Sequence, residues 1–201
     1  MIRDLDETLR KLLQTKASAG SELAGAEITF DLPDATWRAS LEKLTVNGYL
    51  YDIRENLSLR TAQPLLERSP DQTQVRRRTA PVRLDCAYCI TAWSPAPTES
   101  VLDEHRLLSQ VLVVLLKNPT IPGNILQGSL VGQIPPYPTV VAAPDGVKNQ
   151  PEFWGALDQK LKPSLNYVIT LAIRMDEPPP AMGPPVKQVV VKAENKEDFP
   201  A

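Results

Sequence analysis

Apolar residues recur at every third or fourth position over residues 2–16, a spacing that gathers their side chains on one face of a helix. Acidic residues occupy the first turns of this segment and basic residues the later turns, which suits the dipole of a helix. A second helix is predicted over residues 101–117. Its apolar positions cover more than half of the circumference, so we expect a deeply buried core helix.

Strands are predicted where apolar and polar residues alternate, or where branched and aromatic residues cluster. The predicted strands cover 26–31, 44–53, 82–93, 139–142, 167–175 and 186–192. Within 44–53, Val46, Leu50 and Asp52 fall in one phase of the alternation, and Tyr49, Tyr51 and Ile53 fall in the other. The simplest topology pairs segments 44–53 and 82–93 as antiparallel strands, with the residues between them forming an extended tip.

Residues 56–80 contain prolines, polar residues and the run Arg76-Arg77-Arg78, with few apolar positions. We interpret them as a long mobile excursion from the main domain. The arginine run is either a solvated loop tip or a contact for phosphates or an acidic protein surface, and without interleaved aromatic residues it is a weak nucleic-acid signal. Residues 1–175 are expected to form one domain. Residues 176–201 are expected to form a proline-rich, charged extension that includes the strand 186–192.

Composition narrows the classes of partner. Twenty prolines against nine glycines favour rigid, extended connections over flexible loops. A formal net charge of -2 gives no general attraction to nucleic acid or anionic lipid, because both require a positive surface. No run of about 18 apolar residues occurs, and acids stand where a signal peptide carries bases. We therefore expect a soluble protein made in the cytoplasm, with no nucleic-acid partner and no membrane attachment.

The sequence offers little catalytic chemistry. His105 lies in the predicted helix 101–117 without a recognisable nucleophile or orienting acid, which favours a surface or interfacial role. Cys86 and Cys89 lie three residues apart in a predicted strand, so they point to opposite faces, unlike a redox pair or a zinc site. We expect two buried, reduced thiols. We predict no catalytic residue, metal ion or cofactor, and an enzyme site around His105 and Cys89 is the least favoured hypothesis.

Two groups of residues resemble a known signature. The first comprises Phe30-Asp31-Leu32-Pro33, Trp37, Leu41 and the string Thr45-Val46-Asn47-Gly48-Tyr49-Leu50-Tyr51-Asp52-Ile53-Arg54-Glu55-Asn56. The second comprises Thr91-Ala92-Trp93, Glu104-His105-Arg106-Leu107-Leu108 and Leu165-Asn166-Tyr167-Val168-Ile169-Thr170-Leu171. Together they resemble the cap-protein family encoded in the gene clusters of extracellular contractile injection systems, a family formerly known only as a domain of unknown function.

The resemblance implies an α+β fold like that of phage tail terminators, with a mixed, mainly antiparallel sheet flanked by two main helices and long proline-rich loops. It also implies a structural subunit that closes the tube and sheath of a particle as a ring of six copies. Such a subunit becomes part of a particle of the kind that can be released from the cell. The partners would be further copies of the chain and the tube and sheath subunits. The alternative is a baseplate or tube-adaptor subunit of the same particle.

Polar residues follow the signature strand directly. Arg54, Glu55 and Asn56 are better placed for contacts with a partner than for the core, so we take them, with Arg76, Arg77 and Arg78, as candidate interface residues. The alternative is that Arg54 and Glu55 simply pair with each other or with their neighbours.

Overall fold

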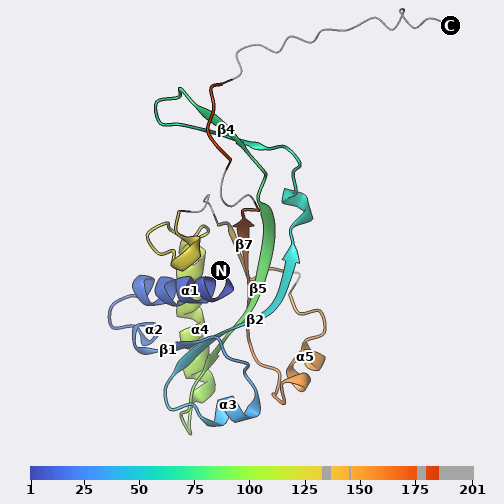
Figure 1. Ribbon diagram of the computed structural model, residues 1–201. Helices are drawn as coiled ribbons and strands as arrows, with labels where there is room; N and C mark the ends of the chain where they lie inside the picture. Colours follow the sequence, from blue (N-terminus) through green and yellow to red (C-terminus); the bar gives the residue numbers. More distant parts are fainter. Residues whose placement is uncertain (133–136, 145, 176–179, 186–201) are drawn as a thin grey trace, which may run out of the picture. The chain divides into compact units, whose positions relative to one another are not determined.

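The computed structural model describes residues 1–132, 137–144, 146–175 and 180–185 (Figure 1). The chain forms two compact units. The first unit consists of Met1–Arg60 and Val82–Ile173, and the second of Thr61–Pro81 and Arg174–Ala201. Each unit is described by itself below.

The first unit contains helices, 3-10 turns and strands. The helices are α1 (Ile2–Lys16), α2 (Glu22–Gly25), α3 (Ala35–Ala39), α4 (Ser100–Lys117) and α5 (Gln150–Ala156), with 3-10 turns η1 (Leu57–Leu59) and η2 (Gly128–Leu130). The strands are β1 (Glu27–Thr29), β2 (Thr45–Glu55), β5 (Val82–Trp93), β6 (Thr139–Val141) and β7 (Leu165–Ile173). Among the described residues, no helix combines the length and the apolar character needed to span a bilayer.

These strands form one sheet in the order β1-β2-β5-β7-β6. β1 runs parallel to β2, and every other neighbouring pair is antiparallel. The predicted α+β fold with a mixed, mainly antiparallel sheet is confirmed, as is the predicted pairing of segments 44–53 and 82–93. β2 continues to Glu55, two residues beyond the predicted end, and pairs there with Leu84.

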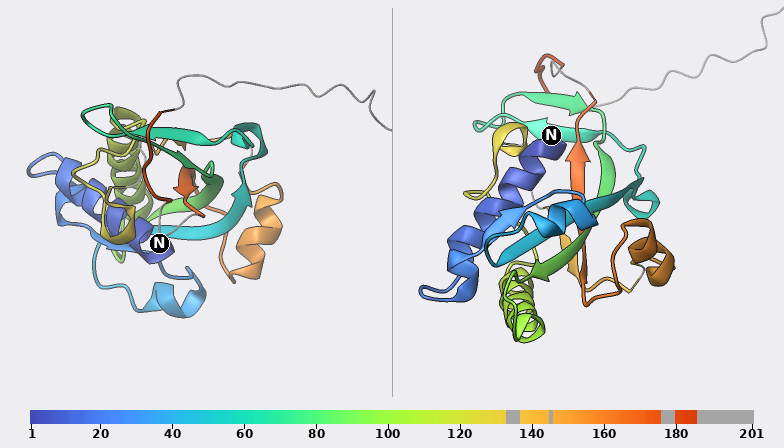
Figure 2. Two further views of the ribbon diagram at one scale, coloured as in Figure 1. Left: turned by 45° about the horizontal axis from the view of Figure 1, so that its top comes forward. Right: turned by 90° about the horizontal axis from the view of Figure 1, so that it is seen from below.

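The two main helices lie on the same face of the sheet (Figures 1 and 2). α1 and α4 cover that face, and the shorter α5 lies against the other. Alternating side chains of β5 therefore enter two hydrophobic clusters. Cys86 and Tyr88 belong to the large cluster shared with α1 and α4, whereas Cys89 and Trp93 belong to a smaller cluster shared with α5. The prediction that Cys86 and Cys89 are buried, reduced and on opposite faces is confirmed.

The burial of α4 differs from the prediction. Leu107, Val111, Val114 and Leu115 are buried against the sheet and α1. Other apolar side chains of the helix face solvent, with exposed fractions of 57% for Val101, 58% for Leu102, 47% for Val113 and 58% for Leu116. The expectation of a deeply buried helix is wrong, because this chain covers only one side of a helix that is apolar over most of its circumference.

Two short helices were not predicted, and each begins at a side-chain cap. The Ser21 hydroxyl accepts a hydrogen bond from the backbone N–H of Ala24 at the start of α2. The Asp34 carboxylate accepts one from the backbone N–H of Trp37, at 2.7 Å, at the start of α3. Such caps satisfy backbone donors that the first helical turn leaves free. The α3 cap places Trp37 against Trp93, with ring centroids 5.4 Å apart.

The second unit contains an antiparallel hairpin of β3 (Leu65–Arg68) and β4 (Val75–Arg78). Val75 also exchanges two backbone hydrogen bonds with Gly183, so a further piece of chain lies along β4. The predicted excursion 56–80 thus has regular structure, while its mobility and the division of the chain at residue 175 stay predictions. The predicted strand 186–192 lies outside the described residues.

Candidate functional site

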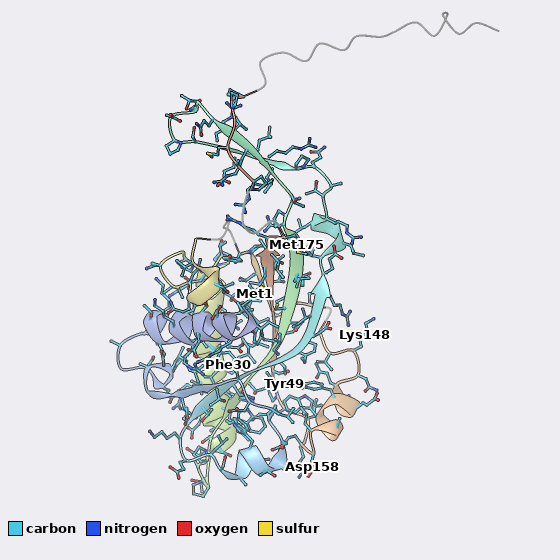
Figure 3. The ribbon with its side chains drawn as sticks, viewed as in Figure 1. Met1, Phe30, Tyr49, Lys148, Asp158 and Met175 are labelled. Atoms are coloured by element: carbon cyan, nitrogen blue, oxygen red, sulfur yellow. The ribbon has the colours of Figure 1, made fainter. Side chains whose placement is uncertain are left out.

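The sheet face opposite α1 and α4 carries a groove of about 880 Å³. Its floor is formed by side chains of β2, β5 and β7, including Tyr49, Ala87 and Val168. Its walls come from η1, from β6 and from the segment that leads into α5. Figure 3 shows Tyr49 on the sheet and Lys148 on that segment. All of these residues belong to the first unit, so one folded body forms the whole groove.

A bulge in β2 decides which side chains enter the groove. The pairing with β5 shifts between Leu50 and Asp52, which leaves Tyr51 as an extra residue on the bulged strand. After the bulge, Asp52 pairs with Ala87, whose side chain also lines the groove. Tyr51 and Asp52 therefore both line the groove, although strict alternation separates them. The predicted phases are thus wrong beyond Tyr51.

The candidate residues Arg54 and Glu55 line one end of the groove and are paired with neighbours. Arg54 Nε lies 2.6 Å from the Asp52 carboxylate, and the Arg54 side chain is 74% exposed. Two nitrogens of Arg60 contact the Glu55 carboxylate at 2.9 and 3.0 Å. The structure thus supports the pairing alternative, although such exposed pairs contribute little stability and leave the side chains available to a partner.

Asn56 holds the end of β2 in place. Its Nδ2 donates hydrogen bonds to both carboxylate oxygens of Asp85, at 2.9 and 3.1 Å. Its Oδ1 accepts the backbone N–H of Leu59 and so caps η1. The Thr170 hydroxyl donates to the same carboxylate at 2.6 Å. Asn56 therefore joins the end of β2 to β5 and η1, and Asp85 extends this network to Thr170 of β7. The sequence pattern did not reveal this structural role.

A deeper hollow of about 200 Å³ adjoins the groove between the sheet and α5. The Tyr51 hydroxyl donates a hydrogen bond of 2.7 Å to Asn166 Oδ1, and Asn166 Nδ2 donates to the Ala143 carbonyl at 3.1 Å. Burial raises the pKa of Tyr51, so its hydroxyl stays protonated and remains a donor at neutral pH. The hydrogen bonds fix the segment before α5 to β2 and β7.

Aromatic side chains continue from the groove along the same face. Phe153 lies 6.3 Å from Tyr49 and 5.6 Å from Trp154 between ring centroids, and Trp154 lies 6.4 Å from Trp93. Trp93 and Trp154 are almost fully buried. Of these rings, Tyr49 and Phe153 line the groove, and Trp93 and Trp154 belong to the buried cluster next to them.

The run Arg76-Arg77-Arg78 lies in β4 of the second unit rather than at a solvated loop tip, which corrects that alternative. Arg76 and Arg78 lie 2.8 and 3.6 Å from the Glu67 carboxylate of β3, and the Arg78 side chain is only 6% exposed. Arg77 points to the other face of the hairpin and is exposed. The structure thus leaves Arg77 as the exposed arginine of the run.

The residues considered for catalysis do not meet. His105 is exposed on the outer side of α4, whereas Cys89 is buried on the sheet face away from α4. Burial raises the pKa of Cys86 and of Cys89 to about 11, which disfavours the reactive thiolate. Within the described ranges, no three side chains of His, Cys, Asp or Glu gather as a metal site. His105, Cys86 and Cys89 therefore do not form one site.

Comparison with known proteins finds one matching family and similar solved structures. A model of the Pvc16 N-terminal domain family matches residues 4–188. The sheath/tube terminator of PVC, an extracellular contractile injection system, solved in its extended state, shares 24% identity with a TM-score of 0.65, over 99% of this chain and 65% of that chain. The cap that terminates the tube of the anti-feeding prophage shares 26% identity with a TM-score of 0.60, over 96% of this chain and 62% of that chain.

This chain therefore spans less than two thirds of the length of each of these two proteins. A comparison with curated proteins found no match.

Proposed function

Because this chain belongs to the Pvc16 N-terminal domain family, we propose that it is a structural cap subunit that terminates the tube and sheath of a contractile injection particle. The observation that carries the proposal is the shared fold: two terminators align with nearly all of this chain. In this proposal the subunit performs no chemistry. It assembles in the cytoplasm and becomes part of the finished particle.

A cap works by occupying the last layer of a polymer, so that no further subunit can add. We propose a ring of identical copies, six in number, that contacts tube and sheath subunits at repeated positions. Because the contacts act together, each can be weak while the whole ring binds tightly. Arg54 and Arg77, both exposed, are candidate contacts with these partners. The other candidates are engaged within the chain: Glu55 pairs with Arg60, Asn56 binds Asp85, and Arg76 and Arg78 pair with Glu67.

Deletion of the gene tests the capping role. We expect particles whose tubes vary in length or whose sheaths detach, as measured by electron microscopy of purified particles. Re-expression of the full chain restores a single length. Particles of normal length and normal sheathing from the deletion strain would overturn the proposal.

The position of the subunit separates a cap from a baseplate or tube-adaptor subunit. A gold label on the full chain is expected at the particle end opposite the spike. A label at the spike end would contradict the cap hypothesis and support a baseplate or tube-adaptor subunit.

A further inference from the structure

The solvent side of α4 carries a mainly apolar strip without Asp, Glu, Lys or Arg, which we call the α4 stripe. It consists of Val101, Leu102, His105, Ser109, Val113 and Leu116. At about 100° per residue, these side chains fall within about a third of the circumference, on the side opposite the buried Leu107 and Val111. The stripe runs over most of the length of α4 and is continuous, so it differs from apolar residues scattered singly over a surface.

The α4 stripe has about half of the area that a stable protein–protein contact buries on one partner. Its four aliphatic side chains are each about half exposed. Covering them removes roughly 400 Å² from water, the size of patch that marks interaction sites on soluble proteins. A stable protein–protein contact buries roughly 800 Å² on each partner, so the stripe supplies about half of one and its polar flanks supply the rest. A macromolecular surface, rather than a small ligand, is the occupant that fits.

The groove on the opposite sheet face has matching properties. Leu57 and Val140 on its walls are 67% and 52% exposed, and Tyr49 and Phe153 pack together beside them. Charged side chains lie at its edge, among them Lys148. Most of the groove lining is apolar, although Asp85 lies on the same face of β5 as Ala87, with its carboxylate hydrogen-bonded to Asn56 and Thr170. The stripe is likewise mainly apolar, with Glu99 before the start of α4 and Lys117 at its end. The two surfaces are alike in polarity and differ in shape, one convex and one hollowed.

From these observations we infer that copies of this chain contact one another head to tail, with the α4 stripe of one copy seated in the groove of the next. The inference deepens the proposed function and rests on it, because a cap needs such a contact to form a ring. Two different surfaces on opposite faces of one body make a heterologous contact, which repeats around a ring until it closes. Every copy in a closed ring then covers both its stripe and its groove.

A second copy suits these surfaces better than a tube or sheath subunit does. A tube or sheath subunit seated on the stripe leaves the groove open, or the reverse, whereas a neighbouring copy covers both at once. A contact between two α4 stripes is also less complete, because it closes as a dimer and leaves both grooves exposed.

The test uses two variants of the full chain and their mixture. Leu102→Glu with Val113→Glu disrupts the stripe, and Leu57→Glu with Val140→Glu disrupts the groove. All four side chains are about half exposed or more, so folding is expected to persist, as checked by thermal unfolding. Leu32→Glu with Leu161→Glu, at positions 49% and 59% exposed outside both surfaces, is the matched control.

Mass in solution is measured by sedimentation over a range of concentrations. We expect the wild-type chain and the control to form larger species, and each test variant to weaken association roughly 100-fold or more. Mixing the two test variants pairs the one intact stripe with the one intact groove, so the mixture is expected to give 1:1 dimers and nothing larger. If Val140→Glu disturbs β6, Leu57→Glu alone carries the groove test, and Leu116→Glu alone repeats the stripe test.

Three results would overturn the inference: a wild-type chain that stays monomeric in concentrated solution, a stripe variant that associates like the wild type, or a mixture that does not pair. None of these three results tests capping itself, which is measured by the length of the particles. If the chain fixes tube length without this contact, the proposed function stands and the inference is overturned. If the chain associates as described but its deletion leaves the particles unchanged, the proposed function is overturned instead.

Discussion

The Nζ atom of Lys162 lies 3.5 Å from the centroid of the Trp93 ring. The same nitrogen donates to the Ala92 carbonyl at 2.6 Å and lies 3.0 Å from the Glu104 carboxylate. Glu104 in turn accepts the backbone N–H of Ser94. Burial lowers the pKa of Lys162, and Glu104 opposes that effect. These contacts join the segment after α5, the end of β5 and the start of α4.

Glu104→Gln is expected to destabilise the protein by about 3 kcal/mol, because it leaves a largely buried ammonium group without its counter-charge. Lys162→Met also leaves the Glu104 carboxylate without its counter-charge, so a loss of similar size is expected, reduced where the Ser94 N–H and the retained packing compensate. Urea unfolding measures both, with Lys160→Met at an exposed position as control. The loss in Glu104→Gln is expected to shrink as the pH rises through the lowered pKa of Lys162, because a neutral amine no longer needs the counter-charge. Equal stability of Glu104→Gln and wild type at neutral pH would contradict this account.

Asn56→Ala is expected to lower the free energy of unfolding by about 1–2 kcal/mol, because the Asp85 carboxylate loses two donors and η1 loses its cap. Asn56→Asp places two carboxylates together, so its loss is larger at neutral pH and smaller in acid, where one becomes protonated. Urea unfolding at two pH values separates these effects. Ser58→Ala in the exposed part of η1 serves as control, and a loss as large there would count against a specific role for Asn56.

Asp4 is expected to stabilise the fold above its normal pKa and to lose that effect in acid. Hydrogen bonds from Ser129 and the N-terminal amine lower the pKa of Asp4 from 3.8 to about 2. A lowered carboxyl pKa contributes stability that is full above 3.8 and disappears as the pH falls through about 2. The difference in urea midpoint between wild type and Asp4→Asn is therefore expected to shrink over this range.

Asp6 provides a comparison of opposite sign. Burial raises the pKa of Asp6, although the Tyr88 hydroxyl donates to it at 2.7 Å. The wild type is therefore expected to lose stability relative to Asp6→Asn as the pH rises from 3.8 through the raised pKa. A shared trend in Asp4→Asn and Asp6→Asn would contradict whichever of the two assignments has the opposite sign.

Gly128→Ala is expected to destabilise the protein by about 2–3 kcal/mol. Gly128 has a φ of +52°, and an added Cβ overlaps the Asp4 carboxyl group. Gly132 has a φ of +74° with open space around it, so Gly132→Ala measures the backbone strain alone and is expected to cost about 1 kcal/mol. Thermal unfolding compares the two, and equal losses would exclude a role for the close approach to Asp4.

Local patterns along the sequence were enough to predict the central strands. Alternation identified segments 44–53 and 82–93, and spacing alone assigned Cys86 and Cys89 to opposite faces, since both depend only on the two-residue period of a strand. The bulge at Tyr51 was not predictable in this way. It arises from the pairing of β2 with β5, and a single extra residue leaves no mark in the sequence of β2 itself.

The sequence could not reveal the groove as a whole. Arg54 and Glu55 line it as the last two residues of β2, and their role as interface residues stays a prediction, whereas the side chains of its floor come from strands far apart in the sequence. Leu102 and Leu116 look like core residues because an apolar side chain on a helix has the same sequence signal whether its neighbour belongs to the same chain or to another. The pairing of Arg76 and Arg78 with Glu67 depends on the register of the β3–β4 hairpin, which the sequence of residues 56–80 does not indicate.

The placement of the two cysteines makes the native chain suitable for site-specific chemistry. Both thiols are shielded inside the fold, and their pKa values of about 11 leave little thiolate at neutral pH. A maleimide reagent is therefore expected not to react with Cys86 and Cys89 in the folded protein. A new cysteine on the surface can be tagged selectively, so a probe for imaging whole particles requires no change to the wild-type core.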